Sequence, residues 1–190
     1  MTSELSPQDK SLLLRIARDS ITRALHGESL LSLELGEYSP QLQEMGACFV
    51  TLTEGEMLRG CVGSIEASQP LVLDVRDRAL AAAFQDPRFP PLSERELAVV
   101  EIEISILTSP EPLNFQDPEE LPSLLKPGID GVILTHQFRR ATFLPQVWEK
   151  LPDTSDFLSQ LCNKMGAPGD LWQNKPLKVY IYQVQEFQED

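Results

Sequence analysis

The stretch Val99-Val100-Glu101-Ile102-Glu103-Ile104-Ser105-Ile106-Leu107 alternates between apolar and polar side chains through most of its length. Successive side chains of a β-strand point to opposite faces of a sheet, so this pattern predicts a strand with one buried and one wet face. Such one-sided burial is typical of antiparallel sheets, because strands of parallel sheets are usually covered on both faces. Pro110 and Pro112 end the strand, since proline cannot donate a ladder hydrogen bond.

Two pairs of short apolar runs predict β-hairpins elsewhere in the chain. Residues 47–53 and 57–62 flank one short polar turn, and residues 131–135 and 139–144 flank another. Runs rich in β-forming residues that are separated by such a turn are the usual signature of a hairpin. Residues 179–184 also alternate, and they predict a last strand.

Three stretches carry apolar residues at helical spacing: residues 7–26, a stretch between Pro70 and Asp86, and residues 154–165. The first of them opens on Ser6-Pro7, a pairing that is typical of a helix N-terminus. Strands paired by hairpins, with helices set between groups of them, predict an α+β fold. The sheet is expected to be mainly antiparallel, with flanking helices.

The composition indicates one folded domain over residues 1–190, with an N-terminal tail over about residues 1–6. Of the 190 residues, 42% are hydrophobic, which is enough for a core. No apolar run approaches the roughly 20 residues needed to span a bilayer, and no secretory leader is evident. The three cysteines show no paired spacing, and Cys48 and Cys162 lie among apolar residues, so both are expected in the core. We therefore expect a reduced, soluble, cytoplasmic protein.

The charge of the chain argues against two classes of partner. The net charge is −13 at pH 7, so a nucleic acid or an anionic membrane would meet a repulsive field. The two histidines share no ligand motif, and no metal site is expected. A phosphate-binding loop is not expected, because its spacing and its lysine are missing, and no cofactor is expected. A local basic pocket for a small anion remains compatible with this charge.

Cys61 lies close to Gly60 and Gly63, near the end of a predicted strand. Glycines permit close backbone approaches, and two interpretations stay open. In one, a tight turn presents the thiol beside free amides, and Arg59 favours the thiolate that acts as a nucleophile. In the other, Cys61 is a small buried residue in a glycine bulge.

Two further segments contain arginines that are candidates for holding an anion. Pro87 stiffens the segment from Asp86 to Arg88 and could hold both side chains in fixed directions. The alternative is a surface connector that an Asp86–Arg88 contact closes. Arg140 follows another arginine and offers forked donors for a carboxylate or phosphate, unless this charge only protects a strand edge. His136 lies at the predicted hairpin tip, where a solvated turn is the simpler interpretation.

Four blocks of the chain, in order, carry a resemblance to a known family. They are Leu58-Arg59-Gly60-Cys61-Val62-Gly63-Ser64, Asp86-Pro87-Arg88-Phe89-Pro90-Pro91-Leu92, Ile104-Ser105-Ile106-Leu107-Thr108 before Pro110-Glu111-Pro112, and Arg139-Arg140-Ala141-Thr142-Phe143-Leu144-Pro145-Gln146-Val147-Trp148. The first resembles the Leu-Arg-Gly-Cys-Ile/Val-Gly hallmark of the AMMECR domain family, whose microbial members are often called AmmeMemoRadiSam system protein A. Many relatives have a glycine-rich turn where this chain has Thr135-His136-Gln137-Phe138.

The resemblance implies an α+β fold with a larger and a smaller subdomain. It also implies association with a Memo-like protein and a radical-SAM protein, and it supplies no established reaction. It strengthens the cases for Cys61, Arg59, Arg88 and Arg140 as site residues, without deciding between a nucleophilic and a structural thiol.

The leading hypothesis is a protein that handles a small anionic molecule in a cleft centred on Cys61. Cys61 is the candidate nucleophile or acyl carrier, Arg88 and Arg140 orient the anion, and Asp86 or Glu66 is the nearest acid–base candidate. The alternative is a non-catalytic adaptor that docks protein partners through the same surface, so the sequence does not decide whether the protein is an enzyme. The expected binding residues are Arg59, Gly60, Gly63, Ser64, Asp86, Arg88 and Arg140.

Overall fold

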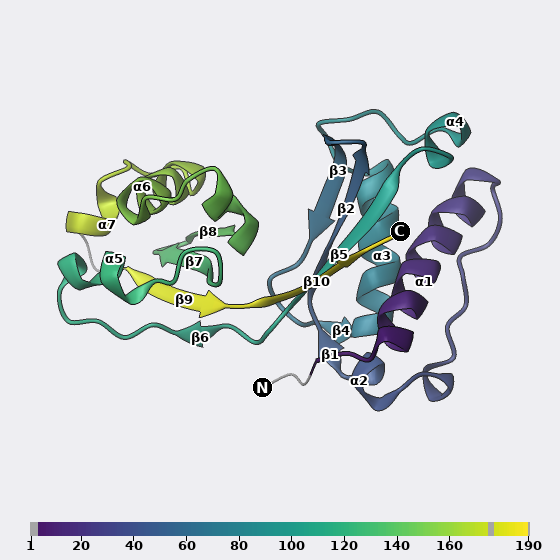
Figure 1. Ribbon diagram of the computed structural model, residues 1–190, viewed down its shortest axis with the longest axis horizontal. Coiled ribbons are helices and arrows are strands. Elements are labelled where there is room, and N and C mark those ends of the chain that lie inside the picture. Colours follow the sequence, from purple (N-terminus) through teal and green to yellow (C-terminus); the bar gives the residue numbers. More distant parts are fainter. Residues whose placement is uncertain (1–3, 175–176, 190) are drawn as a thin grey trace. The chain divides into compact units, whose positions relative to one another are not determined.

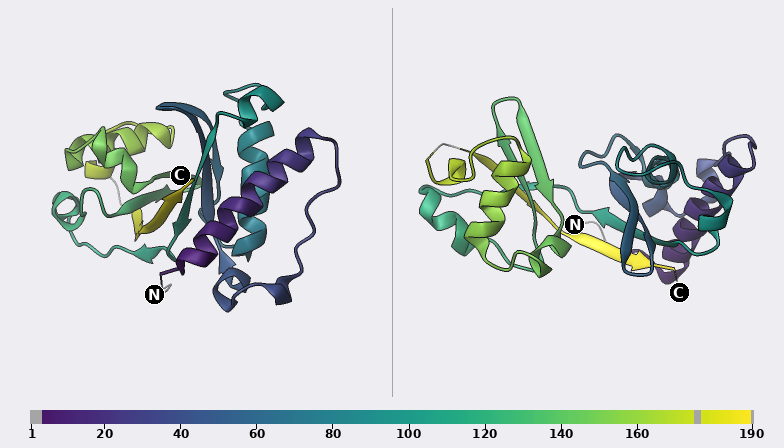
Figure 2. Two further views of the ribbon diagram at one scale, coloured as in Figure 1. Left: turned by 45° about the vertical axis from the view of Figure 1, so that its right-hand side comes forward. Right: turned by 90° about the horizontal axis from the view of Figure 1, so that it is seen from above.

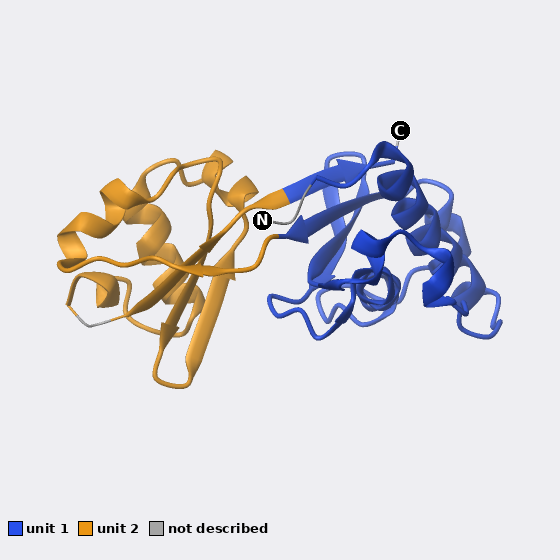
Figure 3. Ribbon diagram, turned by 90° about the horizontal axis from the view of Figure 1, so that it is seen from below, with its two compact units in different colours: residues 1–107, 185–190 blue, residues 108–184 orange. Residues whose placement is uncertain are grey.

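The computed structural model describes residues 4–174 and 177–189 of the chain. The chain divides into two compact units, coloured separately in Figure 3. Unit 1 comprises Met1–Leu107 and Gln185–Asp190, and unit 2 comprises Thr108–Val184. The chain therefore leaves unit 1, forms the whole of unit 2, and returns to unit 1 for its final strand.

Unit 1 is a four-stranded sheet with two long helices on one face (Figure 1, Figure 2). The strand order is β10-β5-β2-β3, and β2 is antiparallel to both β3 and β5. The predicted antiparallel strand is confirmed, although it starts two residues later than the alternating pattern. The elements are α1 (Pro7–Leu25), η1 (Leu35–Glu37), α2 (Pro40–Gln43), β1 (Met45–Gly46), β2 (Cys48–Glu54), β3 (Met57–Gly63), β4 (Gln69–Pro70), α3 (Leu71–Phe84), α4 (Glu94–Leu97), β5 (Glu101–Leu107) and β10 (Val184–Gln188).

The core of unit 1 lies between its sheet and the helices α1 and α3. Val50 and Leu52 of β2 and Ile102 and Ile104 of β5 are fully buried on this face. The predicted start of α1 is also confirmed, because the Ser6 hydroxyl accepts a hydrogen bond from the backbone N–H of Asp9. The alternate side chains of the strands point to the opposite face of the sheet. Among the described residues of unit 1, no helix lies over that face.

Unit 2 has its own four-stranded sheet, in the order β6-β9-β7-β8. Its core is built around Phe157 of α6, whose ring stacks on Trp148 at 3.6 Å between centroids and meets Phe143 edge-on at 5.2 Å. Cys162, on the same helix, is fully buried as expected. The elements are β6 (Glu111–Pro112), η2 (Pro118–Glu120), α5 (Leu121–Leu124), β7 (Gly131–His136), β8 (Arg139–Phe143), η3 (Pro145–Glu149), α6 (Thr154–Lys164), α7 (Leu171–Asn174) and β9 (Lys178–Tyr182).

The prediction of a single last strand was wrong. β9 ends at Tyr182 and pairs in unit 2, whereas β10 starts at Val184 and pairs in unit 1. Gln183 lies between them, and its backbone N–H donates to the Thr108 hydroxyl at 2.9 Å. The alternation continues across this junction without a glycine or proline, so the pattern could not reveal a change of sheet.

Within residues 4–174 and 177–189, no helix combines the length and the apolar character that crossing a membrane requires.

The hairpin between β7 and β8 contains a strained residue, and its replacement is expected to stabilise unit 2. Gln137 has a φ of 56°, a left-handed conformation that glycine adopts readily and other residues adopt at a cost. We expect Gln137→Gly to raise the free energy of unfolding by about 0.5–1 kcal/mol. Tryptophan fluorescence during urea denaturation measures this, because Trp148 and Trp172 both belong to unit 2. Phe138→Gly is the control, and an equal gain there would contradict the argument.

Candidate functional site

Three polar side chains form a row across the sheet of unit 1, on the face opposite its helices. The register pairs Cys61 of β3 with Thr51 of β2, and Thr51 with Glu103 of β5. The Cys61 backbone N–H and C=O bond away from β2, so Cys61 and Thr51 form a non-hydrogen-bonded pair, in which side chains come close. The Thr51 hydroxyl accordingly donates to the Cys61 sulfur at 3.3 Å.

The environment of Cys61 favours the neutral thiol. The side chain is half-buried, and this burial is the main cause that raises its pKa above the usual value. The Thr51 hydrogen bond and the Arg88 charge oppose the shift, while the carboxylates of Asp86 and Glu103 add to it. Cys61 is nevertheless the most accessible of the three cysteines, because Cys48 and Cys162 are both fully buried.

Asp86 and Arg88 bind the backbone of Cys61 at the free edge of β3. The Cys61 N–H donates to Asp86 Oδ2 at 2.9 Å, and Arg88 Nη2 donates to the Cys61 carbonyl at 3.3 Å. The two side chains also bind each other, with Arg88 Nε 2.9 Å from Asp86 Oδ1 and Nη2 2.6 Å from Oδ2. The Arg88 hydrogen bond holds the pKa of Asp86 well below its usual range. The predicted Asp86–Arg88 contact is thus present, and it attaches this segment to Cys61.

Arg59 points away from Cys61 into packed surroundings. The register pairs Leu52 with Gly60 and Thr53 with Leu58, so Arg59 is the extra residue of a β-bulge. Its Nε donates to Glu96 Oε1 at 2.6 Å, and its Nη2 donates to the Pro90 carbonyl at 2.9 Å.

This geometry corrects one expectation about the thiol. The guanidinium of Arg59 lowers the pKa of Glu96 to about 2, whereas Arg88 is the arginine that acts on the pKa of Cys61. The prediction that Arg59 favours the Cys61 thiolate was therefore wrong, because its hydrogen bonds are directed to Glu96 and Pro90.

The two glycines of the motif allow close packing inside the unit. A Cβ atom on Gly60 would overlap the backbone carbonyl oxygen of Ala82 in α3, and one on Gly63 would overlap the ring of Phe49. Cys61 itself lies within β3, so the expected tight turn around it was also wrong. The other interpretation is met only in part: a bulge is present at Arg59 beside Gly60, whereas Cys61 pairs regularly with Thr51 and its thiol is half-buried.

Ser64 anchors the end of the motif to a buried carboxylate. Its hydroxyl donates to Oδ2 of Asp74 at 3.0 Å, and Asp74 of α3 is fully buried. The same carboxylate accepts hydrogen bonds from the Cys48 N–H at 3.0 Å, from Gln69 at 3.2 Å and from Arg78 at 3.1 Å. These contacts tie β2, the segment after β3 and α3 together beneath the motif.

The remaining predicted site residues lie elsewhere. Arg140 lies on β8 of unit 2, opposite Thr135 of β7, so a cleft that joins it to Arg88 stays a prediction. His136 is the last residue of β7. Glu66 is exposed in the segment between β3 and β4. Among residues 4–174 and 177–189, no three histidine, cysteine or acidic side chains gather in a way that could hold a metal ion.

Sequence reasoning missed Thr51 and Glu103 as neighbours of Cys61. The only sequence signal for Glu103 is the alternation around it, which predicts its side chain on the wet face of the strand. The register that aligns it with Thr51 and Cys61 is not visible in the sequence, because it depends on the bulge at Arg59.

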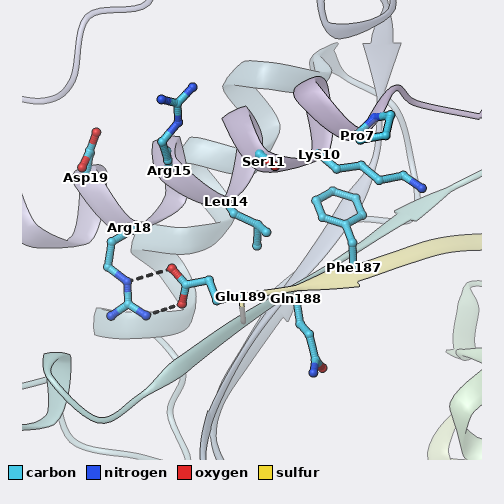
Figure 4. Close-up of a pocket in the computed structure, with 10 residues that line it drawn as sticks. All are labelled: Pro7, Lys10, Ser11, Leu14, Arg15, Arg18, Asp19, Phe187, Gln188 and Glu189. Carbon is cyan, nitrogen blue, oxygen red and sulfur yellow. Dashed lines mark hydrogen bonds and ion pairs between the residues drawn. The ribbon is translucent and has the colours of Figure 1, made fainter.

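A pocket of about 380 Å³ lies elsewhere in unit 1, between α1 and β10 (Figure 4). Lys10, Leu14 and Arg15 of α1 line it together with Phe187 of β10. Arg18 of α1 binds the Glu189 carboxylate there through two nitrogens. It also donates to the backbone carbonyls of Leu97 and Val100, so these contacts connect the end of the sheet to α1. None of the predicted site residues lines this pocket.

Known proteins resemble this chain over nearly its whole length. Proteins from Thermofilum pendens and Methanothermobacter thermautotrophicus are each 38% identical to it, over 97% and 98% of this chain and 92% and 97% of their own lengths. The crystal structure of the uncharacterized protein PH0010 from Pyrococcus horikoshii superimposes with a TM-score of 0.91 at 33% identity, covering 98% of this chain and 94% of that one. The sequence model of the AMMECR1 family matches residues 14–187, and the chain belongs to that family.

Proposed function

We propose that this protein handles a small anionic molecule at the surface around Cys61. The observation that carries the proposal is the position of Arg88, whose half-exposed guanidinium donates to the carbonyl of the half-buried Cys61. A guanidinium offers forked donors that match carboxylates and phosphates. An anion bound by its outward N–H groups would lie beside the thiol.

Cys61 is the candidate nucleophile or acyl carrier in this proposal. It must first lose its proton, because its surroundings favour the thiol. Asp86 is a poor acceptor, since Arg88 keeps it ionised and both of its oxygens are already hydrogen-bonded. The carboxylate within the row is that of Glu103, which lies two strand spacings, or roughly 10 Å, from Cys61. A proton could reach it through the Thr51 hydroxyl or a bridging water.

The pathway proposed for this protein rests on its family. The resemblance to AMMECR proteins supports a pathway shared with a Memo-like protein and a radical-SAM protein. The resemblance also supports Arg140 as a second anion-binding arginine.

A non-catalytic adaptor is the second candidate function. Met57 and Leu58 favour it, because these apolar side chains are 68% and 41% exposed at the start of the same strand.

Removing the Arg88 charge tests the proposal. We expect Arg88→Gln to weaken the binding of phosphate or citrate to the native protein by about tenfold, the loss of about 1.4 kcal/mol that one charge-assisted contact supplies. Titration calorimetry and chemical-shift changes in unit 1 measure the affinity. Arg95→Gln, an exposed arginine of α4, is the matched control and should bind as the wild type does. Equal affinities in all three proteins would refute the anion site.

A further inference from the structure

We propose that Asp86 is a positioning residue that, together with Arg88, takes the place of a missing neighbour strand at Cys61. Its importance for chemistry rests on the proposed function of Cys61, whereas the contact itself can be tested without any ligand. We call this arrangement the clamp. In it, Asp86 accepts a hydrogen bond from the N–H of Cys61, and Arg88 donates one to the carbonyl of Cys61.

The position of β3 in the sheet leaves its outer backbone groups available for such a substitute. β3 is an edge strand, so every second residue directs its N–H and C=O away from the sheet. At Cys61, Asp86 accepts from the N–H as a strand carbonyl would, and Arg88 donates to the carbonyl as a strand amide would. The clamp therefore satisfies the backbone N–H and the carbonyl of Cys61 at the edge of the sheet.

The Asp86 side chain is buried and contacts Cys61 and Arg88. It is 2% exposed, while that of Arg88 is 54% exposed. Its Oδ1 accepts from the N–H and Nε of Arg88 at 3.1 and 2.9 Å, and its Oδ2 accepts from Cys61 and from Arg88 Nη2. With both oxygens engaged and little surface exposed, Asp86 has no free lone pair aimed at a ligand. It instead fixes the peptide that carries the thiol and the guanidinium beside it.

The clamp also sets the charge around the sulfur. The groups that face Cys61 are the Thr51 hydroxyl from β2, the Glu103 carboxylate from β5, and the Asp86–Arg88 pair at the strand edge. Asp86 neutralises the cation that would otherwise favour the thiolate. Loss of the Asp86 charge should therefore lower the pKa of Cys61, and loss of the Arg88 charge should raise it.

Hydrogen exchange of the Cys61 amide, followed by NMR, tests the positioning contact. We expect Asp86→Ala to accelerate exchange of this amide by about tenfold or more, since a hydrogen bond to a charged acceptor is lost. Arg88→Gln should leave it within about twofold of the wild-type rate, because Asp86 still accepts the bond. Asp77→Asn, an acid of α3 that pairs with Arg76, is the control and should have no effect. Unchanged exchange in a folded Asp86→Ala protein would overturn the proposal.

The pH profile of Cys61 alkylation supplies a second readout. It does not need Asp86→Ala, so it tests the proposal even if that variant folds poorly. Asp86→Asn, which keeps the shape of the side chain, should shift the midpoint to lower pH, and Arg88→Gln should shift it to higher pH. A role limited to general packing would move both midpoints in the same direction or neither, and that result would overturn the charge argument. No ligand enters either experiment, so failure of the anion to bind would refute the proposed function and leave this inference standing.

Discussion

Replacing Gly60 by alanine is expected to destabilise unit 1 by about 2–3 kcal/mol, the cost of forcing extra volume into a packed interior. The added Cβ would overlap the carbonyl oxygen of Ala82, and the next nearest atoms belong to the same backbone. A backbone atom inside a helix cannot rotate aside as the end of a side chain can. Strand β3 and helix α3 would have to separate, which would weaken packing along the whole interface.

Urea unfolding followed by far-UV circular dichroism measures the effect of Gly60→Ala. Gly36→Ala is the matched control, because Gly36 has no atom within 4 Å of its Cβ position and no positive φ. We expect that control to change the free energy of unfolding by less than about 0.5 kcal/mol. If the two substitutions cost the same, the close approach of β3 to α3 does not hold.

Cys61 is expected to be alkylated on the order of a hundredfold faster than Cys48 and Cys162 in the native protein. Both other thiols are fully buried, so they can react only when the structure opens. Burial is the main cause that raises the pKa of Cys48, and the charge and hydrogen bond of Asp74 raise it further. Cys61 is half-buried, and it pairs with Thr51 on the face of the sheet opposite the buried Val50 and Leu52.

Timed labelling with iodoacetamide, with peptide mapping by mass spectrometry, separates the three sites. The rate at Cys61 should still be rising above pH 8.5, the usual pKa of a thiol, because the folded surroundings raise its pKa. The same peptide labelled in urea gives the reference profile, which should reach its plateau at lower pH. If Cys48 or Cys162 reacts first, or all three stay protected until unfolding, the nucleophile loses its support and the adaptor becomes the better proposal.

Local patterns in the sequence predicted the elements that depend on local physics. The alternation from Glu101 to Ile106 marked β5, and Ser6 marked the start of α1 through a side-chain cap. The spacing of Phe157, Leu158 and Leu161 likewise marked α6. In each case the residues that decide the structure are neighbours in the chain, so that the pattern and its cause lie within one element.

The candidate site was only partly predictable because its contacts are between distant residues. The segment from Asp86 was identified, and its attachment to Cys61 was not, because the two are joined through a backbone N–H rather than a motif. The expectation about Arg59 was wrong for a physical reason. Proximity in sequence placed it beside the thiol, whereas the bulge turns it toward Glu96.

The interrupted connectivity of unit 1 sets an order for folding on the ribosome. Residues through Leu107 emerge first, yet the sheet that they form lacks β10 until all of unit 2 has been synthesised. During that interval, the outer edge of β5 is an unpaired strand edge in a nascent chain, which is a known route to misassembly. Unit 2 is continuous in sequence and can close as soon as β9 leaves the exit tunnel. The final strand then completes unit 1 after unit 2 has been translated, and Glu189, the residue that follows the strand, bonds to the backbone of Ile102.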